Sequence, residues 1–271
     1  MSNHHEERYD FEITEEGLDY DILDRSFNPT TQAFIERNGI KPGMRVLDVG
    51  SGSGLMTHYL SQQVGQQGQV LSVDISAAQL ARAKQYCDRQ DDKNILFKEL
   101  SVYDLDKNHE TFDLIYCRFV LHHLHSPREA IKLFYDRLNK GGFYIAEEGI
   151  ISAAFSYPPS KAWHYNRQDI PSPDNDVDGV QRDGDFGMKL VYWMKKSGFK
   201  IKDANLIQPL LTTERSKKLL LAGHDAYKNT ALAQGQSEAD WEEQRQELNR
   251  LAEDEFTIVG FYQSCQVCGI K

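Results

Sequence analysis

The chain has 271 residues, and its 31 Lys and Arg residues against 41 Asp and Glu residues give a formal net charge of −10. This acidic balance argues against a nucleic-acid partner, whose phosphates require a basic surface. Hydrophobic residues make up 40% and charged residues 27%, a composition that excludes collagen, a coiled coil and a fully disordered chain. The apolar run 114–121 is broken by Arg118 and falls far short of the roughly 18 residues of a membrane span, so we expect no span. Four cysteines and the absence of a signal-peptide pattern favour a reducing, cytoplasmic location.

Strand and helix patterns alternate through the first 150 residues. Asn28-Pro29 predicts a helix start, and Asn38-Gly39 predicts its end. The capping box at 126–129 predicts another helix, which Gly141-Gly142 would stop. Further helices are predicted at 55–64 and, behind a Ser76 cap, at 77–87, and strands at 44–49, 70–73, 95–97, 112–117 and 143–146. Such alternation favours a parallel sheet with helices on both faces.

The pattern changes after residue 150. Residues 152–184 hold four of the eight prolines and an acidic run, which is typical of a lid or binding loop. Beyond it we expect a helix over 185–197, strands over 199–206 and 257–269, and helices near 214–230 and 238–254, with Ser237 capping the last. The predicted organisation is one domain over 1–271. Its parts are a helical lead-in (1–40), a cofactor-binding core (41–150), a lid-like loop (151–184), and C-terminal helices with the last two strands (185–271).

The segment 46–54 reads VLDVGSGSG and joins a predicted strand directly to a predicted helix. Its glycines permit a tight turn and close approach of a ligand, and the helix N-terminus adds unpaired N–H groups. A dinucleotide site prefers G-x-G-x-x-G, and Asp48 would repel a phosphate but suits a cationic group. Asp74 follows Gly54 by about twenty residues, where a carboxylate can accept both hydroxyls of a ribose. A ligand with ribose and an ammonium but no phosphate is S-adenosylmethionine, and a nicotinamide cofactor stays as the alternative.

Four segments together resemble the class I S-adenosylmethionine-dependent methyltransferases, in the branch that includes the ubiquinone- and menaquinone-biosynthesis enzymes. They are VLDVGSGSG (46–54), VLSVDIS (70–76), FDLIYCRFVLHHL (112–124) and LNKGGFYIAEE (138–148), in the family's order. The resemblance implies a Rossmann-like, doubly wound α/β fold. Its seven-stranded sheet would be mostly parallel with an antiparallel last strand, and helical lid insertions would be added. It also implies an enzyme that converts S-adenosylmethionine to S-adenosylhomocysteine.

The resemblance further implies roles for particular residues. Asp48 would orient the methionine ammonium, Asp74 would hold the ribose, and Ile75 would pack on the adenine. The loop would lie alongside the methionine and ribose portions of the cofactor, through Gly50, Ser51, Gly52 and Gly54. After the third strand the family often has an acid followed by a small residue; Ser101-Val102 aligns with that pair, and Tyr103-Asp104 aligns with it less well. Cys117 and Arg118 would line the sulfonium end, and Arg25 would meet the methionine carboxylate.

The predicted reaction is an in-line displacement, for which the protein mainly aligns the reactants. A base would add rate if the nucleophile is a hydroxyl or an acidic carbon, and the candidates are His122, His123, Glu148 and His164. We expect no metal, because His122 and His123 are adjacent and point apart in most backbones. The expected acceptor is a small, partly hydrophobic molecule, and the C-terminal helices could support a homodimer. A methyltransferase acting on protein or RNA and a non-catalytic binding protein stay open as alternatives.

Overall fold

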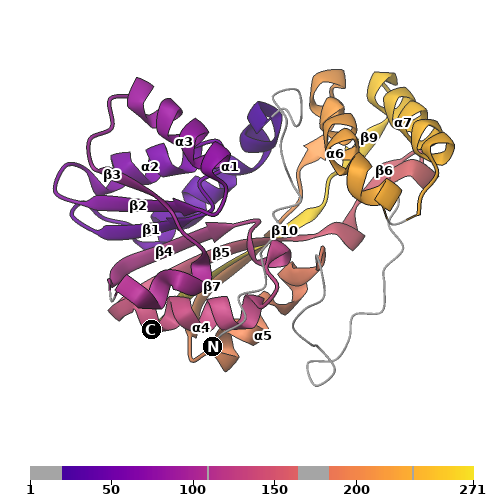
Figure 1. The fold of residues 1–271 in the computed structure, drawn as a ribbon. Coiled ribbons are helices and arrows are strands. Elements are labelled where there is room, and N and C mark those ends of the chain that lie inside the picture. The colour runs from indigo at the N-terminus through magenta and orange to yellow at the C-terminus, as the bar shows by residue number, and fades with distance from the viewer. Residues whose placement is uncertain (1–19, 109, 164–182, 234) are drawn as a thin grey trace. The chain divides into compact units, whose positions relative to one another are not determined.

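The computed structural model describes residues 20–108, 110–163, 183–233 and 235–271, drawn in colour in Figure 1. These residues form two compact units, and each is taken by itself. The larger unit comprises the described parts of 28–150, 183–207 and 264–271. The smaller unit comprises 20–27, 151–163 and the described parts of 208–263. The division of one domain into lead-in, core, lid and C-terminal part stays a prediction.

A seven-stranded sheet forms the centre of the larger unit, with strand order β3-β2-β1-β4-β5-β10-β7. The pairs β1–β2, β1–β4, β2–β3 and β4–β5 are parallel, and β10 runs antiparallel to β7. The strands are β1 (Arg45–Val49), β2 (Gln69–Asp74), β3 (Ile95–Glu99), β4 (Phe112–Arg118), β5 (Leu138–Ile150), β7 (Lys200–Ile207) and β10 (Gln263–Ile270). This topology confirms the predicted fold class. Because Val49 pairs with both Val73 and Cys117, the carboxyl ends of three strands lie level at one edge.

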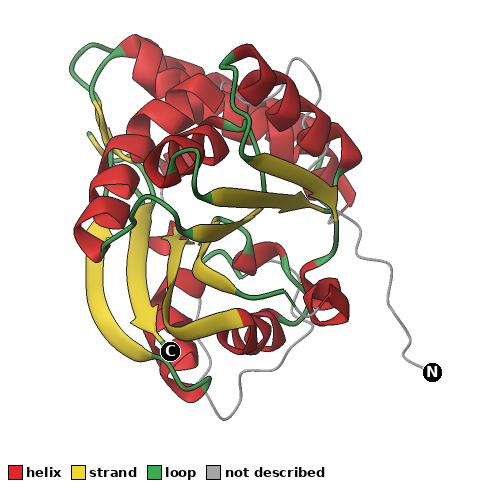
Figure 2. Ribbon diagram, turned by 90° about the vertical axis from the view of Figure 1, so that its left-hand side faces the viewer, coloured by secondary structure: helices red, strands yellow, loops and turns green. Residues whose placement is uncertain are grey.

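Helices cover both faces of this sheet, as Figures 1 and 2 show. The helices α2 (Leu55–Val64) and α3 (Ala77–Arg89) lie on one face, and α4 (Pro127–Arg137) and α5 (Phe186–Lys196) lie on the other. On the first face Phe34 and Ile35, from α1 (Tyr20–Asn38), join Met56 and Leu60 in the core cluster. Burying each such side chain stabilises the fold by roughly 1.5–3 kcal/mol. The apolar helix face predicted from the residue spacing is therefore buried against the sheet.

One helix start and one helix cap differ from prediction. α1 begins eight residues before Asn28 and carries Pro29 in its interior. Asn28 therefore lies inside the helix, and its Oδ1 accepts a bond from Arg118 Nη1 at 2.7 Å instead of capping a helix start. At the other site α4 does begin at Pro127, but Ser126 makes no side-chain cap bond, and its own N–H donates to the hydroxyl of Tyr103.

The glycine pair that was expected to stop α4 lies instead inside β5. α4 ends at Arg137 and β5 starts at Leu138. Gly141 N–H donates to the carbonyl of Lys271, and Lys271 N–H donates to the carbonyl of Gly142. The glycines therefore serve sheet pairing with the chain's last strand rather than helix termination.

The smaller unit has a three-stranded antiparallel sheet in the order β6-β9-β8 and two long helices. Its elements are β6 (Phe155–Tyr157), β8 (Leu210–Leu211), β9 (Ile258–Gly260), α6 (Glu214–Ala233) and α7 (Glu238–Glu253). The Ser237 cap is confirmed, since its hydroxyl accepts the N–H of Asp240. The single strand expected over 257–269 is wrong: β9 pairs within this small sheet, whereas β10 pairs with β7. The expected loop starts with β6 and two short 3-10 helices, and its residues 164–182 lie outside the described ones.

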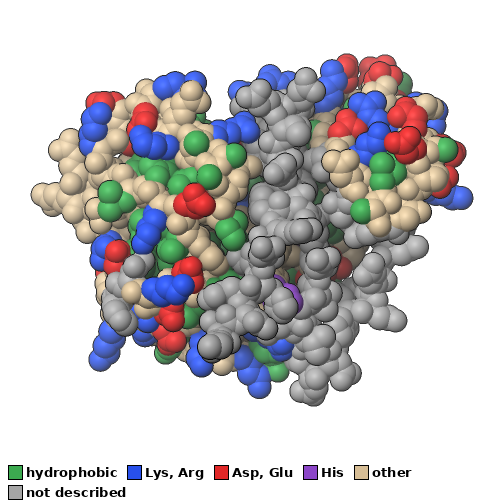
Figure 3. All heavy atoms as spheres, in the orientation of Figure 1, with side chains coloured by type: hydrophobic (Ala, Val, Ile, Leu, Met, Phe, Trp, Pro, Cys, Tyr) green, Lys and Arg blue, Asp and Glu red, His purple; other side chains and the backbone are tan. Residues whose placement is uncertain are grey.

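Two surface properties bear on partners. Among the described residues no helix is both long enough and apolar enough to cross a bilayer. On the face drawn in Figure 3, basic and acidic side chains of the described residues are interspersed rather than gathered by sign.

Candidate functional site

The loop between β1 and α2 uses its three glycines for different reasons. All three have positive φ: 84° at Gly50, 50° at Gly52 and 82° at Gly54. A Cβ on Gly50 would lie 2.5 Å from Val120 Cγ2, and one on Gly54 would lie 2.8 Å from backbone atoms of Ala83. A Cβ on Gly52 would meet only the carbonyl oxygen of Gly50, at 4.0 Å. Packing therefore requires glycine at the two ends of the loop, while the middle glycine borders open space.

Asp48 sits under this loop in a network of hydroxyl groups. Its Oδ2 accepts bonds from Thr57 Oγ1 at 2.5 Å and Ser72 Oγ at 3.2 Å, and the hydroxyls of Ser51 and Ser72 lie 2.8 Å apart. Burial raises the pKa of the Asp48 carboxyl to about 6, against the opposing effect of the two hydroxyl donors. Sequence reasoning missed Thr57 and Ser72. The available signal was a serine inside the otherwise apolar strand VLSV.

Asp74 ends β2 beside the same loop. Its Oδ1 accepts the N–H of Ser76 at 2.9 Å. Burial raises the pKa of its carboxyl, and the backbone N–H groups of Ser76, Gly52, Ser51 and Ile75 oppose that rise by favouring the charged form. The structure thus brings Asp74 to the glycine loop, as the spacing predicted.

The segment after β3 lies next to Asp74 through the backbone. Leu100 N–H donates to the Asp74 carbonyl at 3.0 Å. In the following residues, Ser101 Oγ accepts the N–H of Tyr103, and Val102 is buried at the start of a short 3-10 helix (Val102–Asn108). This places Ser101 and Val102 near the predicted ribose position, and their contact with adenine stays a prediction.

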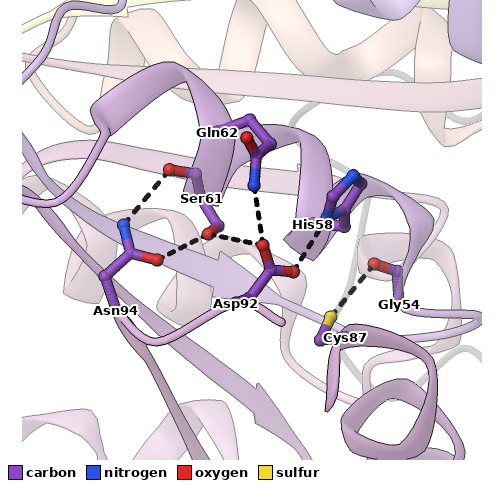
Figure 4. Close-up of polar contacts among 7 residues, drawn as sticks. All are labelled: Gly54, His58, Ser61, Gln62, Cys87, Asp92 and Asn94. Atoms are coloured by element: carbon purple, nitrogen blue, oxygen red, sulfur yellow. Dashed lines mark hydrogen bonds and ion pairs between the residues drawn. The ribbon is translucent and has the colours of Figure 1, made fainter. Parts of the chain in front are cut away.

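A polar cluster around Asp92 fixes α2, and Cys87 of α3 reaches the loop beside it (Figure 4). The buried Asp92 carboxylate faces His58 Nδ1 at 2.8 Å and accepts bonds from Gln62 Nε2 at 2.8 Å and Ser61 Oγ at 3.3 Å. Cys87 donates its thiol hydrogen to the carbonyl of Gly54, with sulfur and oxygen 3.6 Å apart. These contacts hold the helical side of the glycine loop in place.

At the end of β4 two predicted cofactor residues point to opposite sides of the sheet. The Cys117 side chain is fully buried, and burial raises the pKa of its thiol well above the ordinary value. Arg118 Nη1 donates to Asn28 and, at 3.2 Å, to Thr31 Oγ1. Thr31 in turn donates to the buried carboxylate of Glu147 at 2.6 Å. Arg118 therefore belongs to a polar cluster beneath α1, and the cofactor contacts of both residues stay predictions.

The connection that follows β4 carries two of the base candidates. Phe119 has φ +55°, a left-handed conformation that costs a residue other than glycine roughly 1–2 kcal/mol. His122 Nδ1 lies 2.7 Å from Glu148 Oε2. The ring centroids of His122 and His123 lie 3.8 Å apart, so the expectation that these adjacent side chains point apart is wrong.

Two predicted site residues, Arg25 and His164, do not belong to the described part of the larger unit. Arg25 is exposed and lies in the part of α1 that belongs to the smaller unit. His164 lies outside the described residues. Within the described part of the chain, no group of three or more His, Cys, Asp or Glu side chains is arranged to hold a metal ion.

Comparisons with known proteins agree with this geometry. Residues 47–144 match a family described as "Methyltransferase domain". The chain is 35% identical over 109 residues to a ubiquinone/menaquinone biosynthesis C-methyltransferase of Legionella pneumophila, covering 40% of this chain and 44% of that protein. It is 32% identical over 116 residues to a ubiquinone biosynthesis O-methyltransferase of Coxiella burnetii, covering 42% and 47%. The match thus spans less than half of either relative.

Among solved structures, the fold resembles that of the [4+2]-cyclase SpnF, with a TM-score of 0.56 and 17% identity over 90% of this chain and 81% of that one. The family match thus identifies residues 47–144 as similar to a methyltransferase domain, and both relatives are methyltransferases by name. The resemblance read from the sequence is thereby confirmed.

Proposed function

We propose that this protein transfers the methyl group of S-adenosylmethionine to a small, partly hydrophobic acceptor by in-line displacement. The observation that carries the proposal is the juxtaposition of Asp74 with a glycine loop whose middle residue, Gly52, borders open space. A carboxylate at the end of the second strand suits ribose hydroxyls, and bare backbone permits a ligand to approach closely.

The chain's own residues would bind and orient the cofactor. Asp74 would accept hydrogen bonds from both ribose hydroxyls, and Ile75 would pack on the adenine. Asp48, held by Thr57 and Ser72, would present negative charge toward the methionine ammonium. S-adenosylmethionine would supply a methyl group already activated on sulfonium, so the protein's main task would be alignment.

Isothermal titration with S-adenosylmethionine tests the binding step. We expect saturable binding by the wild type and a loss of affinity of tenfold or more in Asp74→Ala, because a charge-assisted contact disappears. Asp106→Ala, an exchange at an exposed position of the short helix after β3, is the matched control and should bind as the wild type does. Absence of binding by the wild type at millimolar ligand would refute the proposal.

Two observations keep other reactions in view. Ubiquinone-pathway C- and O-methyltransferases are both similar to this chain, so the acceptor atom does not follow from the likeness. A cyclase shares the fold, and a fold by itself does not define a reaction. Formation of S-adenosylhomocysteine only when an acceptor is added would separate methyl transfer from mere binding. The cytoplasmic location and the homodimer stay predictions.

A further inference from the structure

Glu148 is a buried carboxylate whose two oxygens are both occupied. It is fully buried near the end of β5. Its Oε1 accepts the backbone N–H groups of Val120 at 2.9 Å and Leu121 at 2.7 Å, and its Oε2 lies 2.7 Å from His122 Nδ1. An oxygen pair committed in this way is poorly placed to remove a proton from a substrate, although Glu148 was one of the candidate bases.

These contacts hold the turn after β4, which has a strained backbone, against the glycine loop. The turn enters through Phe119, with φ +55°, whose N–H donates to the Glu147 carbonyl at 2.9 Å. Strain of this kind persists only where surrounding contacts enforce it, and it clusters at functional sites. Val120 packs so closely on Gly50 that a Cβ there would overlap it. The carboxylate therefore holds the segment containing His122 beside the glycine loop.

The same carboxylate determines which nitrogen of His122 carries hydrogen. An ionised carboxylate only accepts hydrogen bonds, so Nδ1 must be the donor to Oε2. In a neutral imidazole the lone pair then lies on Nε2. No residue in the described part of the chain hydrogen-bonds Nε2, and the His122 side chain is 19% exposed. This nitrogen is free to take a proton.

We propose that His122 is the general base of methyl transfer and that Glu148 is the residue that positions it. A base adds rate when the nucleophile must lose a proton, and the proposal takes a hydroxyl group, rather than an amine, as the acceptor group. The inference rests on the proposed function and deepens it. The acceptor O–H bond breaks as its proton passes to His122 Nε2, and an oxygen electron pair forms the new O–C bond. The C–S bond breaks with its electrons left on sulfur. The positive charge that leaves the sulfonium thus reappears as imidazolium beside the Glu148 carboxylate.

A substitution at Glu148 can reverse the histidine tautomer while keeping the turn anchored. In Glu148→Gln the amide oxygen must face the N–H groups of Val120 and Leu121, because the amide NH₂ cannot accept from them. The NH₂ group then donates to His122 Nδ1 and places the hydrogen on Nε2. Glu147→Gln is the matched control, since Glu147 is the adjacent buried carboxylate and bonds Thr31 and Ser264 instead.

Nitrogen-15 NMR of the imidazoles, assigned with His122→Gln, measures the tautomer directly. We expect the Nδ1–H form in the wild type and in Glu147→Gln, and the Nε2–H form in Glu148→Gln. An Nε2–H wild type, or a tautomer that Glu148→Gln leaves unchanged, would overturn the positioning role.

Methyl transfer to catechol, with benzylamine as the probe without a hydroxyl, tests the base and the acceptor class. We expect catechol to be methylated. The kcat should fall about a hundredfold or more in His122→Gln and Glu148→Gln, with KM for S-adenosylmethionine little changed. Undiminished kcat in His122→Gln, transfer to benzylamine alone, or no transfer to catechol would overturn this inference. Calorimetry with S-adenosylmethionine on the same samples keeps the two claims apart, since only a failure to bind it counts against the proposed function.

Discussion

The different surroundings of the loop glycines predict different losses of folding free energy for alanine at Gly52 and at Gly54. Gly52→Ala places a Cβ in open space, so its folding cost is that of a left-handed alanine, roughly 1–2 kcal/mol. Gly54→Ala has the same backbone cost. In addition, its Cβ would lie 2.8 Å from backbone atoms of Ala83, so α3 must move, which adds about 1–3 kcal/mol.

The effect of each substitution on S-adenosylmethionine affinity should depend on whether the ligand approaches that glycine, and not on how well the protein folds. If a ligand approaches the bare backbone at Gly52, the added methyl group should weaken S-adenosylmethionine binding by tenfold or more, although the protein stays folded. Urea unfolding measures the free energy of unfolding, and titration calorimetry measures affinity. Gly43→Ala is the control, because Gly43 has φ +86°, no neighbour within 4 Å of its Cβ, and a position before the opposite end of β1. Gly52→Ala with wild-type affinity, or Gly54→Ala more stable than Gly52→Ala, would refute the reasoning.

Three other substitutions probe buried polar groups. Burial raises the pKa of Asp48 from 3.8 to about 6, so the folded chain keeps a proton that the unfolded chain releases between these values. As pH rises from about 3 to about 7, the wild type should therefore lose about 3 kcal/mol of stability relative to Asp48→Asn, and about 2 kcal/mol of that between about pH 4 and about pH 6. Urea titrations across this range would contradict the burial argument if the difference stayed constant. His224 stacks on Trp241, with the ring centroids 3.6 Å apart, and burial lowers the pKa of its imidazole. The unfolded chain therefore binds a proton more readily than the folded chain, so acidification below about pH 6.5 should destabilise the smaller unit. His224→Gln should melt with less acid sensitivity by circular dichroism, and an equal sensitivity would count against this cause. Asp92→Ala should cost about 1–3 kcal/mol, because three side chains lose a buried acceptor, and an unchanged melting temperature would show that the network does not stabilise α2.

Local patterns were sufficient for much of the larger unit. The helix at 55–64 was predicted with its observed bounds, and the Ser76 and Ser237 caps were predicted correctly. The reason is that capping bonds and helix faces involve residues at most a few positions apart. The approach of Asp74 to the glycine loop was also predictable, because parallel strands place their carboxyl ends at one edge.

Predictions failed where a distant segment competes for a local signal. Asn28-Pro29 looks like a helix start, but Arg118 engages the Asn28 side chain and α1 continues through the proline. Likewise, 257–269 is apolar enough for one strand, yet its two halves pair in different sheets. Neither competitor is visible in the local sequence.

What the sequence by itself determined is therefore the alternation of strands and helices in the larger unit, the strand–glycine–helix motif and the resemblance to methyltransferases, since each depends on short-range spacing. Only the tertiary structure decided what the acids near those strand ends do. Glu147 and Glu148 are neighbours with equal chemistry in the sequence. β5 turns one toward Thr31 and Ser264 and the other toward the turn after β4 and His122. The physical reason is that strand alternation sends successive side chains to opposite faces, and each face offers its own hydrogen-bond donors.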